Sequence, residues 1–166
     1  MIEIKKIEFN TKQELYEFLD RSIGAILNEE SDWLANLCNT TALIWDVMKD
    51  INWIGFYLIK DGQLVLGPFQ GKPACTRINI GEGVCGTAAE RRESIVVGDV
   101  HAFSGHIACD SATNSELVVP LIMGNRIVGV LDIDSPELNR FDFEDKTGFE
   151  KIAGTILKCV TIPERY

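Results

Sequence analysis

The chain is short of positive charge: its 166 residues include 16 Lys and Arg against 25 Asp and Glu, which gives a formal net charge of -9. The two basic pairs, Lys5-Lys6 and Arg91-Arg92, stand far apart, so no cationic stretch is available to bind phosphates. We therefore expect no nucleic-acid partner. The same shortage disfavours binding to an anionic membrane surface.

Long hydrophobic runs are also missing. No apolar run approaches the roughly 20 residues needed to span a bilayer. Residues 1–10 mix Lys and Glu into an alternating pattern that differs from the apolar core of a signal peptide. We find no repeat, low-complexity tract or linker either. These absences predict a single domain over residues 1–166, in the cytoplasm and without a membrane partner.

The five cysteines are an odd number, and none of them belongs to a C-x-x-C pair. In a reducing compartment we expect free thiols, with any disulfide transient and catalytic. Cys38 falls on an apolar helical stripe, which predicts a core thiol, and Cys159 near the end of the last predicted helix is interpreted as structural or idle. Cys75, Cys85 and Cys109 fall in or beside loops, where thiols are more available for reaction. Spacing alone leaves open whether these three cooperate or are unrelated.

Hydrophobic periodicity predicts two helices first, with Thr11 and Ser31 as their N-caps. The period then changes to two, and Asp61-Gly62 is typical of a type I′ hairpin turn. Antiparallel pairing and helices segregated from the strands make the predicted fold class α+β. The later predicted elements are strands at 53–59 and 63–66, a short helix at 87–91, strands at 94–100, 117–123 and 126–133, and a last helix from about 141 to 160.

A second group of candidate residues is acidic and aromatic. Residues two apart on a strand share a face, so Asp132 and Asp134 project together, while Glu116 begins another strand. Such carboxylates are either a solvated strand end, a site for an ammonium group, or a carboxyl with a raised pKa. Trp53 and Tyr57 also share a face, as core residues or as a wall against a small apolar or thioether group.

A metal site is the weaker interpretation of the irregular loop at 101–115. His101, His106 and Cys109 offer nitrogen and sulfur ligands there, and Cys75 or Cys85 could complete a tetrahedron. Their spacing matches no standard zinc finger or ribbon, so we expect no bound metal.

Six segments, taken in order, resemble the free methionine-(R)-sulfoxide reductases. They are NWIGFY at 52–57, GPFQGKPAC at 67–75, GEGVCG at 81–86, HIACD at 106–110, SELVVP at 115–120 and LDIDS at 131–135. The resemblance covers nearly the whole chain and is densest between residues 53 and 135. It implies a GAF-like α+β fold, in which an antiparallel sheet of about six strands carries helices packed on one side.

The resemblance also implies roles for individual residues. Cys109 would be the nucleophile, Cys75 its main resolving partner, and Cys85 a second thiol in the relay. The substrate site would be lined by Trp53, Tyr57, Glu116, Asp132 and Asp134.

The implied reaction reduces free L-methionine (R)-S-oxide to methionine through a cysteine sulfenic acid and an intramolecular disulfide. No cofactor would be bound, and thioredoxin, supplied with electrons from NADPH by thioredoxin reductase, would recycle the enzyme. The resemblance further implies a role in repair after oxidative stress and a homodimer. Two alternatives stay open: a GAF module that senses a small molecule, and a thiol redox sensor or peroxidase that uses the same cysteines.

Overall fold

The computed structural model describes residues 8–105 and 111–163, and six strands there form one antiparallel sheet in the order β3-β2-β1-β6-β5-β4. The strands are β1 (Trp53–Lys60), β2 (Gln63–Gly71), β3 (Arg77–Asn79), β4 (Ile95–Val97), β5 (Ser115–Met123) and β6 (Arg126–Ser135). The helices are α1 (Lys12–Glu29), α2 (Trp33–Val47), α3 (Gly83–Arg91), the short 3-10 helix η1 (Val100–Ala102) and α4 (Phe143–Cys159).

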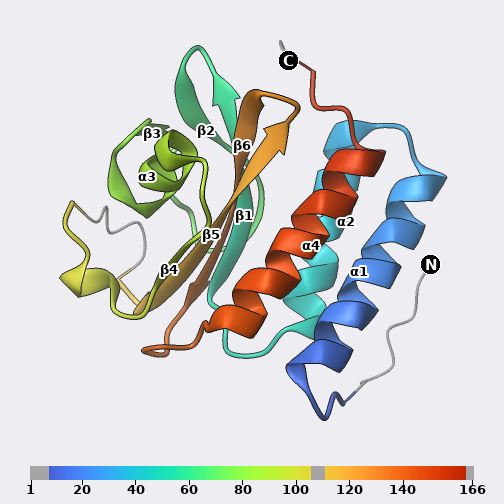
Figure 1. The fold of residues 1–166 in the computed structure, drawn as a ribbon, viewed down its shortest axis with the longest axis horizontal. Coiled ribbons are helices and arrows are strands. Elements are labelled where there is room, and N and C mark those ends of the chain that lie inside the picture. Colours follow the sequence, from blue (N-terminus) through green and yellow to red (C-terminus); the bar gives the residue numbers. More distant parts are fainter. Residues whose placement is uncertain (1–7, 106–110, 164–166) are drawn as a thin grey trace.

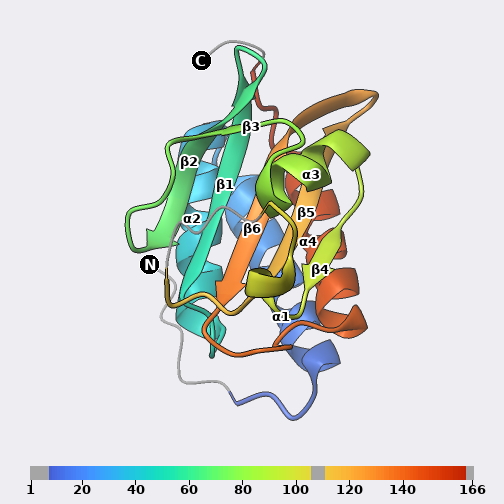
Figure 2. The same cartoon turned by 90° about the vertical axis from the view of Figure 1, so that its left-hand side faces the viewer.

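The sheet separates two layers of unequal size. Helices α1, α2 and α4 pack on one face, and α3 lies over the other (Figure 1). Seen from the side of α3, this helix and η1 lie in front of the strands (Figure 2). The predicted α+β class and the antiparallel sheet of about six strands are confirmed. The three long helices share one side as expected, and the short α3 covers the opposite face.

Strand alternation distributes the side chains of β1 between these two layers. Ile54, Phe56 and Leu58 join the core under the three long helices, whereas Trp53 and Tyr57 join the cluster under α3. All five are buried, and full burial of an aliphatic or Phe side chain contributes about 1.5–3 kcal/mol. β1 is therefore a central strand with apolar contacts on both faces.

The hairpin turns follow the sequence closely. Asp61 and Gly62 both have positive φ, 52° and 78°, as the predicted type I′ turn between β1 and β2 requires.

Strands β5 and β6 each extend two residues beyond the predicted bounds, β5 at its start and β6 at its end. These extensions place Glu116 and Asp134 inside regular strands, where their side chains have fixed directions.

The helix N-termini correct one prediction. The Thr11 side chain accepts a hydrogen bond from the Glu14 N–H, as predicted for α1. The second predicted cap, Ser31, is wrong: Asp32 caps α2 by accepting from the Ala35 N–H at 2.8 Å. A carboxylate one residue later outcompetes the hydroxyl, because charge-assisted hydrogen bonds are the stronger ones.

The prediction that Cys38 is a core thiol is wrong. Helix α2 buries Leu37, Thr41 and Ile44 and leaves Cys38 exposed. The predicted stripe included Leu34, which is 46% exposed, so the buried face is rotated from the one that the apolar residues suggested. Apolar residues on both sides of the helix made the direction of its buried face ambiguous.

Differences also occur in the middle of the chain. Helix α3 starts at residue 83, four residues before the predicted start, and the predicted strand at 94–100 shortens to β4, with η1 following. Strand β3 was not predicted, because its three residues pair only with the start of β2 at the sheet edge. Short edge strands carry too little periodicity to be recognised in a sequence.

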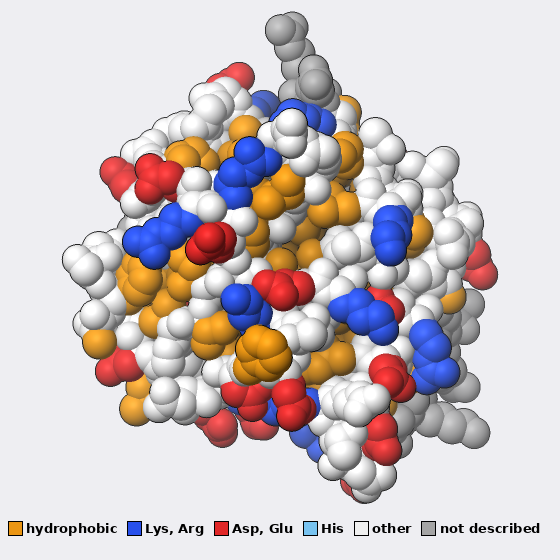
Figure 3. All heavy atoms as spheres, viewed as in Figure 1, with side chains coloured by type: hydrophobic (Ala, Val, Ile, Leu, Met, Phe, Trp, Pro, Cys, Tyr) orange, Lys and Arg blue, Asp and Glu red, His pale blue; other side chains and the backbone are white. Residues whose placement is uncertain are grey.

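Among the described residues, no helix has the length and apolar character that a membrane span requires. On the face of the molecule drawn in Figure 3, Lys and Arg side chains are interspersed with Asp and Glu side chains. That face therefore offers no cationic patch of the kind that binds nucleic acid.

A buried polar cluster joins α1 to α4. Asp145 is fully buried, and its carboxylate accepts hydrogen bonds from the Tyr16 hydroxyl at 2.7 Å and from the Asp142 N–H at 2.9 Å. Lys12 and Arg140 form ion pairs with it. Both carboxylate oxygens are thus satisfied, which is the condition for keeping a charge inside a protein.

Candidate active site

A pocket opens between α3 and the sheet, and it brings together all five side chains that were predicted to line the substrate site. Its walls come from β1, β5, β6, the segment after β2 and the start of α3. The lining residues are Trp53, Tyr57, Lys72, Pro73, Ala74, Ile78, Glu82, Gly83, Val84, Cys85, Thr113, Glu116, Asp132 and Asp134.

The aromatic side of the pocket is a stack of three rings. Trp53 lies between Phe69, at 5.5 Å between ring centroids, and Tyr57, at 5.8 Å. Gly55 makes room for the indole: a Cβ added there would lie 2.4 Å from the Trp53 ring. The indole N–H donates to the Lys72 carbonyl at 3.1 Å. The ring is therefore fixed in place as a flat apolar wall.

The aromatic wall is connected to one of the predicted catalytic thiols. The Tyr57 hydroxyl donates to the Cys75 carbonyl at 3.0 Å. Cys75 itself is half-buried and disulfide-bonded. The three residues before it, 72–74, line the pocket, so this cysteine follows directly on the wall of the site.

The carboxylates face the pocket from two neighbouring strands. In the β5–β6 register Glu116 pairs with Asp134, and Val118 pairs with Asp132. Paired residues of antiparallel strands share a face, so all three acids point toward α3, as the same-face prediction for Asp132 and Asp134 requires. Glu116 and Asp132 are buried, each 6% exposed.

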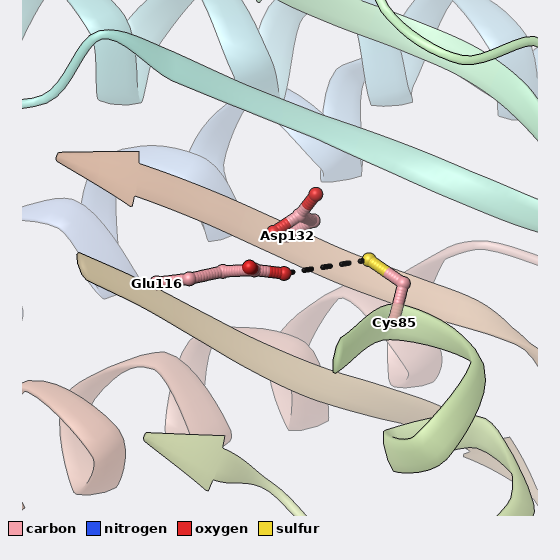
Figure 4. A group of neighbouring side chains, drawn as sticks. All are labelled: Cys85, Glu116 and Asp132. Atoms are coloured by element: carbon pink, nitrogen blue, oxygen red, sulfur yellow. Dashed lines mark hydrogen bonds between the residues drawn. The ribbon is translucent and has the colours of Figure 1, made fainter. Parts of the chain in front are cut away.

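Cys85 completes this group from the first turn of α3. It is buried and 4% exposed, and its thiol donates to Glu116 Oε1 at 3.9 Å (Figure 4). The prediction that Cys85 lies in or beside a loop and is more available for that reason is wrong, because α3 begins before it. At the first position of α3, Gly83 has a φ of 60°, a conformation that suits a residue without a side chain.

Burial controls the protonation of this cluster. Burial and the negative charge of Asp132 raise the pKa of Glu116 well above its usual value. Burial also raises the pKa of Asp132, to about 7. The pKa of the Cys85 thiol is raised by burial and by the charges of both acids. These shifts favour the protonated forms of Glu116 and Cys85 over their charged forms.

Two predicted residues, His106 and Cys109, lie outside the described residues. The nucleophilic role of Cys109 and the alternative zinc site on its loop therefore stay predictions. Of the proposed zinc ligands, His101 is exposed, and its Nε2 lies 3.1 Å from Asn114 Oδ1.

Sequence reasoning missed the positive side of the pocket. Lys72 lines it, and so do Gly83 and Val84 at the N-terminus of α3. Glu82, the N-cap, makes no side-chain capping bond to this end of α3. A helix N-terminus carries partial positive charge and N–H donors that suit an anion. The signal was the glycine-rich segment at 81–86 directly before the predicted helix, for which we had predicted no role in binding an anion.

Comparison with known proteins places the chain in a family. A family model described as a GAF domain matches residues 35–158. The chain is 52% identical, over 90% of both chains, to the "Free methionine-R-sulfoxide reductase" of Escherichia coli (strain K12). The chain belongs to the free methionine-(R)-sulfoxide reductases, a family with the GAF fold. The protein of the same name from Saccharomyces cerevisiae is 46% identical, over 90% of this chain and 88% of that one.

The same family provides a similar solved structure. The free methionine-R-sulfoxide reductase of Neisseria meningitidis, determined in complex with its substrate, matches with a TM-score of 0.88 and 43% identity over 92% of both chains. The family membership and the GAF fold that the six segments predicted are confirmed.

Proposed function

We propose that this chain reduces free methionine-(R)-sulfoxide to methionine with cysteine thiols, in the pocket between α3 and the sheet. The observation that carries the proposal is the composition of this pocket. It combines buried acids, a fixed aromatic wall and a thiol, and the relatives named above carry this activity in their names.

The two ends of the pocket suit the two charges of a free amino acid. Asp132 Oδ1 is buried and accepts no hydrogen bond from any described residue, so it can receive the substrate ammonium. The carboxylate of the substrate then lies near Lys72 and the N-terminus of α3. The S-methyl group of the substrate packs on Trp53. Peptide-bound methionine lacks the free ammonium and would leave Asp132 unpaired, so the site selects the free form.

Glu116 serves as the proton donor. Its pKa is raised by burial and by the charge of Asp132, which favours the protonated form, and it lines the same pocket as Trp53 and Asp132. A proton on the sulfoxide oxygen makes the sulfur electrophilic, and a buried carboxyl with a raised pKa can supply that proton as a general acid.

The chemistry then runs through the cysteines. The Cys109 thiolate attacks the sulfoxide sulfur, the oxygen passes to the cysteine as a sulfenic acid, and methionine leaves with two more electrons on its sulfur. The Cys75 thiol condenses with the sulfenic acid and releases water. The disulfide-bonded state of Cys75 supports this role. Cys85, buried and protonated, is a second thiol in the relay rather than the first nucleophile.

Recycling needs a dithiol, and thioredoxin is poised to reduce the disulfide by exchange. The electrons come from NADPH through thioredoxin reductase, so the enzyme itself needs no bound cofactor. Such a cycle belongs in a reducing compartment, which is the reason for proposing the cytoplasm.

A homodimer is also proposed, with the exposed face of α2 as its interface. This face carries Leu34, Cys38 and Trp45, and the helix has no charged residue from 33 to 45. Two copies of a chain with net charge -9 repel unless they meet through an uncharged surface. A two-fold contact of α2 with itself meets that condition. Sedimentation of the parent and of Trp45→Glu tests it: a monomeric parent overturns the dimer.

The activity is tested by NADPH consumption with thioredoxin and thioredoxin reductase. Separated R and S epimers of free methionine sulfoxide, a peptide-bound sulfoxide and the Cys109→Ser variant are compared. Turnover of the free R epimer alone, lost in the variant, is expected. No turnover of any epimer by folded, reduced protein would overturn the proposed function.

A further inference from the structure

Three side chains in the pocket can hold a metal ion. Cys85 from α3, Glu116 from β5 and Asp132 from β6 converge on one point (Figure 4). Each offers one ligand atom, the Cys85 Sγ and a carboxylate oxygen of each acid, and these atoms all lie within 4.8 Å of one another. All three residues are buried, so the potential ligands are held by packing and not by long mobile side chains.

One ligand atom already needs a partner. Asp132 Oδ1 is buried, lines the pocket, and accepts no hydrogen bond from any described residue. None of the ion pairs between described residues reaches Asp132 either. A buried carboxylate oxygen without a partner costs free energy. A cation that enters the pocket therefore gains a favourable contact there, whether it is an ammonium group or a metal ion.

The donor set decides which metal fits. A thiolate with two carboxylates suits a thiophilic ion such as Zn²⁺ or Co²⁺, whereas Mg²⁺ and Ca²⁺ prefer oxygen ligands alone. Tetrahedral zinc with bonds of about 2.3 Å to sulfur and about 2.0–2.2 Å to oxygen sets neighbouring sulfur and oxygen ligands about 3.5 Å apart. Cys85 Sγ and Glu116 Oε1 are 3.9 Å apart, so this pair of ligands needs only a small approach. The fourth position faces the pocket, where Asp134 or water can fill it.

We propose that the reduced, substrate-free protein binds one divalent cation of the zinc class through Cys85, Glu116 and Asp132, and that the bound ion excludes the substrate. On binding, the Cys85 S–H bond is replaced by a sulfur–metal bond, and the thiol proton and the carboxyl proton pass to solvent. No electron is transferred, so no oxidant or reductant is required. The pocket thus holds an inhibitory site that shares two acids with the substrate site.

The two halves of this proposal have different foundations. Metal binding depends only on the three ligands and their geometry. Exclusion of substrate rests on the proposed function, because it requires the substrate ammonium and the metal to compete for Asp132. Cobalt spectra report on metal binding, and turnover in the presence of Zn²⁺ reports on the exclusion of substrate.

Cobalt titration of the reduced protein under argon tests the binding. One equivalent of Co²⁺ is expected to produce a thiolate-to-cobalt charge-transfer band and the intense visible bands of tetrahedral cobalt. Cys85→Ser should abolish the charge-transfer band, and Asp132→Asn should weaken binding by about tenfold or more. Cys38→Ser and Cys159→Ser are matched controls at exposed cysteines outside the pocket, and Cys75→Ser tests the neighbouring loop thiol. All three should keep the band.

Absence of the band in a reduced protein with native circular dichroism would overturn the proposal, as would a band that persists in Cys85→Ser.

The exclusion of substrate is tested by adding Zn²⁺ to the turnover assay, with its free concentration buffered and the thioredoxin system assayed separately. A rise in KM with constant kcat is expected. An active enzyme that shows no band refutes the metal site alone, whereas a cobalt site in a protein without turnover refutes the proposed function alone.

Discussion

Two places in the molecule bury carboxylates, and they do so in opposite ways. Asp145, between α1 and α4, is enclosed by Lys12, Arg140 and the Tyr16 hydroxyl. Asp132, between β6 and α3, has a buried oxygen that accepts no hydrogen bond from any described residue. The first carboxylate is neutralised by two cations of the protein. Among the described residues, the second has only the side chains of Cys85 and Glu116 and the backbone of Ile133 as partners, and its Oδ1 is left for something that enters.

Whether a buried carboxylate has cations of the protein as partners separates a structural acid from a functional one more clearly than its burial does. A buried charge with all its partners joins two helices and has nothing left to bind a ligand. A buried acid without a cation has a raised pKa and an unused oxygen, and both properties suit a substrate that brings an ammonium group and needs a proton. Substitutions of Glu116 and Asp145 should therefore have different consequences, the first for turnover and the second for stability.

Replacing Glu116 by Gln should remove the proton donor and keep the shape of the pocket. We expect kcat for methionine-(R)-sulfoxide to fall by about 10²- to 10⁴-fold, the range of a lost general acid. Steady-state turnover measures this, with Glu29→Gln at an exposed position as the matched control. Retained peroxide reactivity of the thiols in the variant would show that only the sulfoxide step was lost. Unchanged turnover would remove Glu116 from the mechanism.

Replacing Asp145 by Asn should leave two cations beside a neutral side chain. Loss of one partner from a buried ion pair costs about 3–5 kcal/mol, so the free energy of unfolding should fall by that amount. Urea denaturation measures it, and Asp46→Asn, exposed near the end of α2, is the control. KM and kcat of the folded fraction should not change. A variant that loses activity without losing stability contradicts the structural role.

A smaller loss is expected for Tyr16→Phe. This change removes only the 2.7 Å hydrogen bond from the hydroxyl to Asp145 and keeps the ring against Phe149. Hydrogen bonds to charged groups contribute about 1.5–3 kcal/mol, which is the expected decrease in the free energy of unfolding. If the double variant with Asp145→Asn is no less stable than Asp145→Asn alone, the two residues act together.

Glu116→Gln should also have a small effect on the pH dependence of stability, and this effect is a gain for the variant where the two preceding substitutions lower stability. The folded protein holds a proton on Glu116 that the unfolded chain releases above a pKa of about 4.3. The contribution of Glu116 to the stability of the parent therefore falls as pH rises above that value, and Glu116→Gln removes this contribution. The difference in melting temperature between the variant and the parent should therefore favour the variant more at pH 8 than at pH 5. Each kcal/mol of stability corresponds to about 2–4 °C in a protein of this size. Equal differences at both pH values would contradict the raised pKa.

The sequence was most informative where periodicity is strict. Alternation in β1 and β6 placed Trp53, Tyr57, Asp132 and Asp134 on their correct faces, and the Asp61-Gly62 turn fixed the first hairpin. These features depend on neighbouring residues along the chain, so a sequence pattern can report them.

Features that depend on distant contacts were missed. The exposure of Cys38 depends on which side of α2 meets the sheet, and the burial of Cys85 depends on where α3 begins. The unpaired oxygen of Asp132 depends on what lies across the pocket. Tertiary packing decides all three, and residue spacing does not contain that information.

The ring stack of Trp53 has a spectroscopic consequence. The indole is fixed between two rings and hydrogen-bonded to the backbone three residues before the disulfide-bonded Cys75. The other two tryptophans, at 33 and 45, belong to α2, in the opposite layer. Reduction of the disulfide should therefore change the emission of Trp53 and leave that of the other two constant. The molecule carries a built-in fluorophore whose signal can be followed through each redox step without an added dye.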